Sequence, residues 1–161
     1  MSKINRREFI GKTTKTALAT AAASTFSINV LGANERVVIG VAGIHGRGSW
    51  LAPEFAKRKD VHVKYLADPD SRLFPDRAKA IEEVGGGTPQ CVQDFRRVLD
   101  DPEVQGLVSA TPNHWHALST VWACQAGKDV YVEKPTCHNI WEGRKMIEAA
   151  RKYDRVVMCG M

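Results

Sequence analysis

The chain has 161 residues, of which 43% are hydrophobic and 25% are charged. This length suits one domain, and this composition excludes a collagenous, a fully disordered and a multi-pass membrane protein. The formal net charge is +5, but residues 1–33 hold five of the basic side chains and only one acid. The rest of the chain is therefore close to neutral, which argues against a nucleic-acid-binding body.

The N-terminal segment, residues 1–33, places Arg6 and Arg7 ahead of a weakly apolar run rich in Ala and Thr, residues 16–27. This run has too few large aliphatic residues to span about 30 Å of hydrocarbon, which disfavours a permanent membrane span. The segment resembles a twin-arginine (Tat) signal, and the resemblance implies export to the periplasm. A basic disordered tail is the alternative interpretation.

From Arg36 onward, apolar runs alternate with helical patterns. Strands are predicted over residues 37–42, 61–67, 91–92, 104–110, 130–132 and 156–159. Helices are predicted over residues 47–58, 75–85, 95–99, 115–126 and 139–153, with Asp94 as the cap of the third helix and Gly127 ending the fourth. The strands read as continuous apolar runs, which is typical of a parallel sheet covered on both faces. Residues 34–161 are therefore predicted to form a doubly wound α/β domain of the Rossmann type, with about six strands.

The tryptophans are expected to be packing residues, and the histidine and cysteine patterns give no sign of a metal site. Trp115, Trp122 and Trp141 are expected to pack between helices rather than to act as platforms for a ligand. His114 and His116 are expected to point apart at the start of a helix, without a third ligand. The cysteines lack the CxxC pairs of a zinc site, and we expect them to be free and buried. They are Cys91, Cys124, Cys137 and Cys159.

The turn after the first predicted strand reads Gly-Ile-His-Gly-Arg-Gly, residues 43–48, and opens a helix. Glycines in such a turn let backbone N–H groups approach a pyrophosphate at the positive end of the helix. Gly43 and Gly48 fit the first and third positions of G-x-G-x-x-G, but His45 replaces the middle glycine. Alone, the loop also fits a glycine-rich turn that binds nothing.

Asp68 ends the second predicted strand, about 25 positions beyond Gly43. This is near the spacing of the acid that accepts the hydroxyls of the adenosine ribose. A carboxylate there disfavours the 2′-phosphate of NADP, so NAD is favoured, while the nearby Arg72 leaves NADP open. The alternative for Asp68 is a solvated residue at a strand end. Together, the loop and Asp68 predict a dinucleotide site.

Two polar segments follow the fourth and fifth predicted strands. They are Thr-Pro-Asn-His-Trp-His, residues 111–116, and Glu-Lys-Pro, residues 133–135. Both are expected at the carboxyl edge of the sheet, where ligands bind in such folds. Lys134 can donate a proton to, or polarise, a substrate oxygen, although a lone exposed lysine is usually a solvated charge. His116 is expected to be structural or to contact the cofactor.

The export segment, the glycine loop, Asp68, the string ATPNHWHAL and the EKP triplet together resemble the Gfo/Idh/MocA oxidoreductases. The family is named for glucose-fructose oxidoreductase, inositol dehydrogenase and MocA, and the resemblance covers residues 35–161. It implies that NAD or NADP is bound with its pyrophosphate on Gly43, Gly46, Arg47 and Gly48 and its adenosine ribose on Asp68. It also implies that the nicotinamide half lies along Asn113, Trp115, His116 and Glu133, with Lys134 as the catalytic residue.

The resemblance implies an NAD(P)-dependent oxidoreductase acting on a sugar or polyol. NAD-dependent glycosidases form a neighbouring branch and give a second interpretation. Family members continue after the sixth strand into a second α/β domain, which completes the substrate pocket and commonly mediates oligomerisation. We expect this chain to lack that domain. A non-catalytic dinucleotide-binding module or a truncated fragment is therefore the competing hypothesis.

Overall fold

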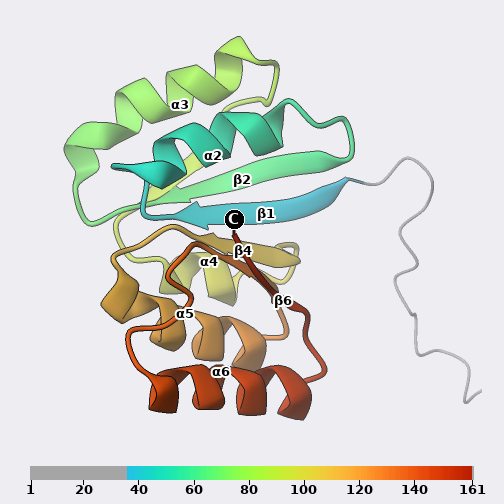
Figure 1. Cartoon of the computed structure of the whole chain (residues 1–161). Coiled ribbons are helices and arrows are strands. Elements are labelled where there is room, and N and C mark those ends of the chain that lie inside the picture. The colour runs from blue at the N-terminus through green and yellow to red at the C-terminus, as the bar shows by residue number, and fades with distance from the viewer. Residues whose placement is uncertain (1–35, 161) are drawn as a thin grey trace, which may run out of the picture. The chain divides into compact units, whose positions relative to one another are not determined.

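One parallel sheet organises the part of the chain that the computed structural model describes, residues 36–160. The export signal predicted over residues 1–33 lies outside this range. The spatial order of the strands is β3-β2-β1-β4-β5-β6 (Figure 1). The strands are β1 (Val37–Ala42), β2 (Val61–Ala67), β3 (Gln90–Val92), β4 (Gly106–Ser109), β5 (Asp129–Val132) and β6 (Val157–Cys159). The chain winds outward from β1 and then from β4, which confirms the predicted doubly wound α/β fold.

Helices cover both faces of this sheet. Those of the described residues are α2 (Arg47–Ala56), α3 (Phe74–Glu83), α4 (Arg96–Asp100), α5 (Asn113–Gln125) and α6 (Ile140–Lys152). A 3₁₀ turn, Ser71–Leu73, precedes α3. Figure 1 shows α2 and α3 on one face and α5 and α6 on the other. Each helix connects two parallel strands, so every strand ends at the same edge of the sheet.

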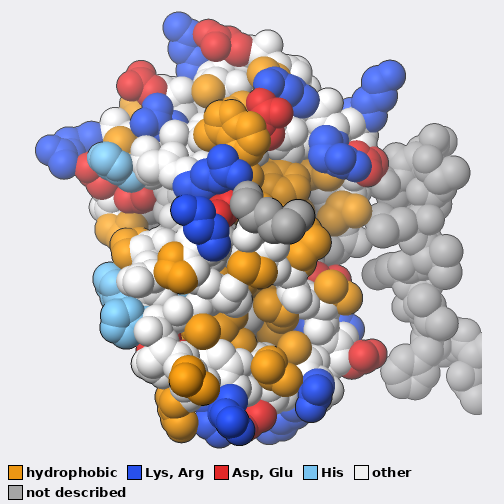
Figure 2. Space-filling model, in the orientation of Figure 1, with side chains coloured by type: hydrophobic (Ala, Val, Ile, Leu, Met, Phe, Trp, Pro, Cys, Tyr) orange, Lys and Arg blue, Asp and Glu red, His pale blue; other side chains and the backbone are white. Residues whose placement is uncertain are grey.

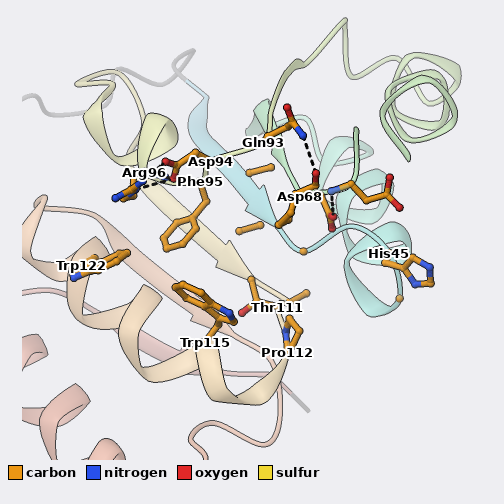
Figure 3. Close-up of a pocket in the computed structure, with 17 residues that line it drawn as sticks. His45, Asp68, Gln93, Asp94, Phe95, Arg96, Thr111, Pro112, Trp115 and Trp122 are labelled. Carbon is orange, nitrogen blue, oxygen red and sulfur yellow. Dashed lines mark hydrogen bonds and ion pairs between the residues drawn. The ribbon is translucent and has the colours of Figure 1, made fainter. Parts of the chain in front are cut away.

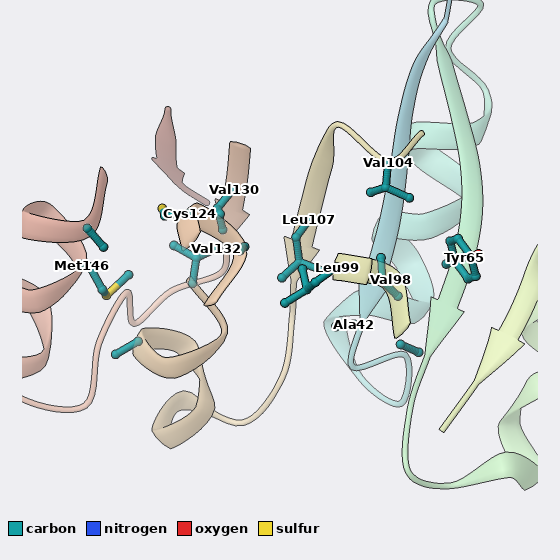
Figure 4. Close-up of a cluster of buried hydrophobic side chains, with 14 residues drawn as sticks. Ala42, Tyr65, Val98, Leu99, Val104, Leu107, Cys124, Val130, Val132 and Met146 are labelled. Carbon is teal, nitrogen blue, oxygen red and sulfur yellow. The ribbon is translucent and has the colours of Figure 1, made fainter. Parts of the chain in front are cut away.

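Two apolar layers hold the helices on the sheet. On one face, Val41 packs with Leu51 of α2 and Ile81 of α3. On the other face, Leu107 and Val132 belong to a second cluster, which α4, α5 and α6 complete (Figure 4). Because the central strands are buried on both faces, their sequences are apolar without alternation, as predicted.

Several predicted boundaries differ from the structure by one or two residues, and two of the differences have a clear physical reason. The fourth strand is shorter than its apolar run, because the buried Val104 lies in a turn where its N–H donates to the carbonyl oxygen of Asp101 (3.2 Å). Helix α4 begins at Arg96, one residue later than expected, with Phe95 in the cap position. Asp94 still contributes, since its Oδ1 accepts a hydrogen bond from the Arg96 N–H (3.0 Å).

The prediction of packed tryptophans and buried cysteines is only partly correct. Trp141 is 66% exposed and Trp115 is 40% exposed, so neither is a core residue, whereas Trp122 is half-buried and stacks on Phe95. All four cysteines are free, as expected, but only Cys124 is fully buried. Trp115 and Trp141 depart from expectation because helical spacing alone does not distinguish a packed face from the wall of a pocket, where Trp115 lies, or from an exposed face, where Trp141 lies.

The surface carries no continuous basic face in the view of Figure 2. There, Lys and Arg side chains lie at separate places, with acidic and hydrophobic side chains between them. Between residues 36 and 160, the structure contains no helix with the length and apolar character needed to cross a membrane.

Candidate dinucleotide site

A pocket of about 820 Å³ opens at the carboxyl edge of the sheet. The loops that follow β1, β2, β3 and β4 line it, together with the first turns of α5 (Figure 3). This is the edge where ligands bind in doubly wound sheets, and the volume is in the range of sites for cofactors and drug-sized molecules.

The glycine loop forms one wall, and its shape depends on close backbone contacts. Gly43 has φ +81°, and a Cβ on it would come within 2.6 Å of the Ala110 carbonyl oxygen. Gly48, in the first turn of α2, lies against Gly43, so that an added Cβ would lie 1.9 Å from the Gly43 carbonyl oxygen. Gly46 is different, because a Cβ there would meet nothing within 4 Å. Gly43 and Gly48 therefore shape the loop, and Gly46 leaves open space at the start of α2.

Asp68 lies in the pocket wall, where the sequence predicts a ribose acceptor, and it also holds the loops in place. Its Oδ2 accepts the Ile44 N–H and its Oδ1 accepts the Asp70 N–H, each at 2.9 Å. The side chain is largely buried. Each carboxylate oxygen keeps a second lone pair for a ligand hydroxyl. The spacing in the sequence predicted only the binding role, since the structural role depends on the fold of the glycine loop.

A second carboxylate, Asp70, extends the negative charge at this end of the pocket. Arg72 donates to both of its oxygens, at 2.8 and 2.7 Å. These hydrogen bonds lower the pKa of Asp70 to about 2. Arg72 is thereby held by Asp70, which limits its ability to compensate for a phosphate near Asp68. The arrangement favours NAD over NADP more strongly than the sequence suggested.

Aromatic residues form the wall opposite Asp68. The ring of Trp115 meets Phe95 edge to face, with centroids 6.3 Å apart, and Phe95 stacks on Trp122 at 5.8 Å. Trp115 thus lies beside the loop after β3, across the pocket from Asp68 (Figure 3). The family resemblance implied a place for Trp115 along the nicotinamide half, and no sequence pattern predicted the contribution of Gln93, Asp94, Phe95 and Arg96. Their position directly after β3 was the available signal.

A second group of predicted residues lies outside the pocket lining. The Arg47 Nε donates to Glu133 Oε1 at 3.0 Å, and the Arg47 guanidinium lies 4.4 Å from the centre of the Trp50 ring. The Lys134 N–H donates to the other carboxylate oxygen of Glu133 (3.1 Å). Arg47, predicted to bind pyrophosphate, is therefore engaged through one nitrogen and retains its two terminal NH₂ groups.

Opposing effects set the charge of Glu133. Burial acts to raise the pKa of this carboxyl, but the hydrogen bonds from Arg47 and from the Lys134 N–H outweigh it and leave the pKa below its ordinary value. Glu133 is thus a buried carboxylate that joins the start of α2 to the loop after β5.

The remaining predicted residues surround this second group. Lys134 is exposed and the Lys134–Pro135 peptide bond is cis. Asn113 begins α5 and is partly exposed. His116 is buried, whereas His114 is exposed, so the two rings point apart, as expected. The structure therefore brings Gly43, Gly46, Asp68 and Trp115 together in the pocket wall and places Lys134 beside it.

Comparison with known proteins agrees with this geometry. Residues 35–161 match the model of the Gfo/Idh/MocA family, described as an oxidoreductase family with an NAD-binding Rossmann fold. Because the match spans most of the chain, this chain belongs to the Gfo/Idh/MocA family. The family description makes residues 35–161 an NAD-binding Rossmann domain.

Two of the similar proteins are named as dehydrogenases and one as a glycosyl hydrolase family 109 protein. The chain is 30% identical to levoglucosan dehydrogenase of Pseudarthrobacter phenanthrenivorans, over 68% of this chain and 25% of that protein. It is 29% identical to myo-inositol 2-dehydrogenase of Thermotoga maritima, over 76% and 35%. A glycosyl hydrolase family 109 protein of Shewanella is 27% identical over 98% of this chain and 39% of its own length. The chain thus spans between a quarter and two fifths of these relatives.

Solved structures show the same fold. GenD2 from gentamicin A biosynthesis, determined in complex with NAD, is 25% identical with a TM-score of 0.71, over 78% of this chain and 34% of that one. An NAD-binding oxidoreductase from Klebsiella pneumoniae is 29% identical with a TM-score of 0.64, over the same shares.

The residues of the pocket fit this cofactor. Gly46 leaves open space at the start of α2, where backbone N–H groups can face a pyrophosphate. Asp68 retains acceptor capacity for ribose hydroxyls.

We expect Gly48→Ala to destabilise the domain by about 1–3 kcal/mol, because its Cβ would overlap the Gly43 carbonyl oxygen. Gly106→Ala is the matched control, since a Cβ there meets only ordinary contacts, the nearest at 3.4 Å, and it should change stability by less than about 0.5 kcal/mol. Urea unfolding of both variants measures the difference. Equal midpoints would show that the loop does not need glycine at position 48.

Proposed function

We propose that this chain supplies the NAD-binding domain of an oxidoreductase that acts on a hydroxyl group of a sugar or polyol. The observation that carries the proposal is the pocket at the carboxyl edge of the sheet, in which the glycine loop and Asp68 meet. The names of two relatives, levoglucosan dehydrogenase and myo-inositol 2-dehydrogenase, support the substrate class.

Oxidation of an alcohol removes a hydride from carbon and a proton from oxygen. NAD, when bound, accepts the hydride. Lys134 is the proposed group for the proton, because its exposed amine follows β5 at the edge of the sheet where the pocket opens. Glu133 supports this role, since its carboxylate binds the Lys134 backbone N–H.

A second candidate function is NAD-dependent glycoside hydrolysis. It is favoured by the Shewanella family 109 relative, whose similarity covers 98% of this chain. In this chemistry, transient oxidation of the sugar permits elimination of the leaving group, and re-reduction restores the cofactor. The two functions therefore differ in whether NADH accumulates.

We further propose that residues 1–33 direct export by the Tat route to the periplasm. The pair Arg6 and Arg7 ahead of a weakly apolar run supports this proposal. Proteins exported in this way commonly fold before transport, often around a bound cofactor, which is compatible with an NAD-binding domain.

NADH should bind the purified chain, and Asp68→Ala should weaken binding by about 1.5–3 kcal/mol through loss of a charge-assisted hydrogen bond. NADPH should bind less tightly than NADH, because its 2′-phosphate would approach both Asp68 and Asp70. Titration calorimetry measures each affinity, and Asp60→Ala is the control because Asp60 is an exposed acid that pairs with Arg58 before β2. The absence of binding heat with a chain that unfolds cooperatively would refute the NAD site.

The reaction type is tested on the full-length product of the gene, with NAD and a panel of sugars, polyols and nitrophenyl glycosides. A dehydrogenase should accumulate NADH, whereas a hydrolase should release nitrophenol without net NADH. Lys134→Ala should reduce either reaction by about 10²–10⁴-fold, the range of general acid–base catalysis. Normal NADH binding without turnover on any substrate would favour the non-catalytic module.

Replacing Arg6 and Arg7 together by Lys should keep the protein in the cytoplasm, because a Tat receptor recognises the arginine pair rather than its charge. The control replaces Lys12 and Lys15 by Arg and should leave export intact. Fractionation of cells followed by immunoblotting measures both. Export of the Lys–Lys variant at the normal level would leave another route as the explanation.

A further inference from the structure

The buried ring of His116 contacts two backbone carbonyl groups. It lies in the first turns of α5 and is 2% exposed. Its Nε2 is 2.7 Å from the carbonyl oxygen of Thr111, and its Nδ1 is 2.7 Å from the carbonyl oxygen of Pro135. Both ring nitrogens therefore face groups that can only accept a hydrogen bond.

These contacts determine where the protons of the ring lie. A neutral imidazole carries one N–H and one lone pair, so one of the two contacts would set a lone pair against a carbonyl oxygen. The 2.7 Å separations leave no room for a bridging water. A ring with a proton on each nitrogen donates to both oxygens, and its charge strengthens both hydrogen bonds.

The two carbonyl groups belong to different parts of the site. Thr111 lines the pocket after β4, whereas Pro135 directly follows Lys134. On the other side of Lys134, Glu133 is bound to Arg47 of α2. Lys134 is thus flanked by two residues that are each bound to a helix, Glu133 to α2 and Pro135 to α5.

We propose that His116 is a positioning residue, protonated on both ring nitrogens, that fixes the loop of Lys134 to the pocket wall. The importance of this loop rests on the proposed function of Lys134, while the protonation state and the bridge rest on the contacts of His116 alone. Among residues 36–160, no carboxylate is hydrogen-bonded to this ring, so the two carbonyl oxygens are the groups that face its nitrogens.

The protonation state is tested by long-range ¹H–¹⁵N correlation spectra of the complete 161-residue chain labelled with ¹⁵N-histidine. At about pH 7, where exposed histidines are mainly neutral, both nitrogens of His116 should resonate as protonated nitrogens with slowly exchanging protons. The exposed His45, His114 and His138 serve as internal references. A single neutral tautomer at His116 would overturn the proposal, and this measurement needs no variant.

The bridge is tested by hydrogen exchange of the His116→Leu variant. The Lys134 amide should exchange about tenfold faster, while the amide of Leu107 in β4 keeps its protection. His114→Leu, which changes an exposed ring on the same turn, should alter neither. Loss of protection throughout β4 and α5 would assign His116 an ordinary packing role and reject the positioning role. Failure to bind NADH would refute the proposed function but would leave these results unaffected.

Discussion

The carboxylate of Asp68 accepts backbone N–H groups from the glycine loop and from the turn after β2, and the pocket takes its shape from these two hydrogen bonds. Without them, the Ile44 and Asp70 N–H groups would be left without this acceptor, at a cost typical of a lost hydrogen bond to a charged group. One side chain therefore does two things. It fixes the loop against the sheet, and it presents its remaining lone pairs to the ligand. The ligand meets an acceptor whose orientation is already set, so less freedom is lost on binding.

The charges of the site are divided between two ends. Asp68 and Asp70 make the β2 end acidic, and Asp70 stays ionised because Arg72 lowers its pKa to about 2. The β5 end carries Arg47 and Lys134, with Glu133 between them. In a dinucleotide, the neutral hydroxyls of the adenosine ribose lie next to an anionic pyrophosphate. NAD therefore suits a site whose acidic end meets the hydroxyls and whose basic residues lie toward the pyrophosphate. A 2′-phosphate would have to lie at the acidic end, where Arg72 is already paired.

The sequence predicted the sheet well because its signal is local and strong. Continuous apolar runs such as Val37–Ala42 and Val61–Ala67 coincide with β1 and β2, since central parallel strands are buried on both faces. The glycine loop and Asp68 were also singled out, because their spacing follows from one strand-helix-strand unit, β1, α2 and β2. The wall made by Phe95 and Trp115 was missed, since it joins elements that are neighbours only after folding. The ion pair of Arg47 with Glu133 was missed for the same reason, as its members lie on β1 and β5 connections.

The described residues provide only part of what the catalytic role proposed for Lys134 requires. Its backbone is held from both sides, through Glu133 on Arg47 and through Pro135 on His116. Its side chain, in contrast, is exposed at the edge of the sheet. A general acid or base must meet its substrate within hydrogen-bond distance, and this requires a surface that positions the substrate against it. The described residues hold the backbone of Lys134 in place. For the proposed role, the surface that directs its amine toward one hydroxyl group is to be sought in the part of the family relatives that this chain does not span.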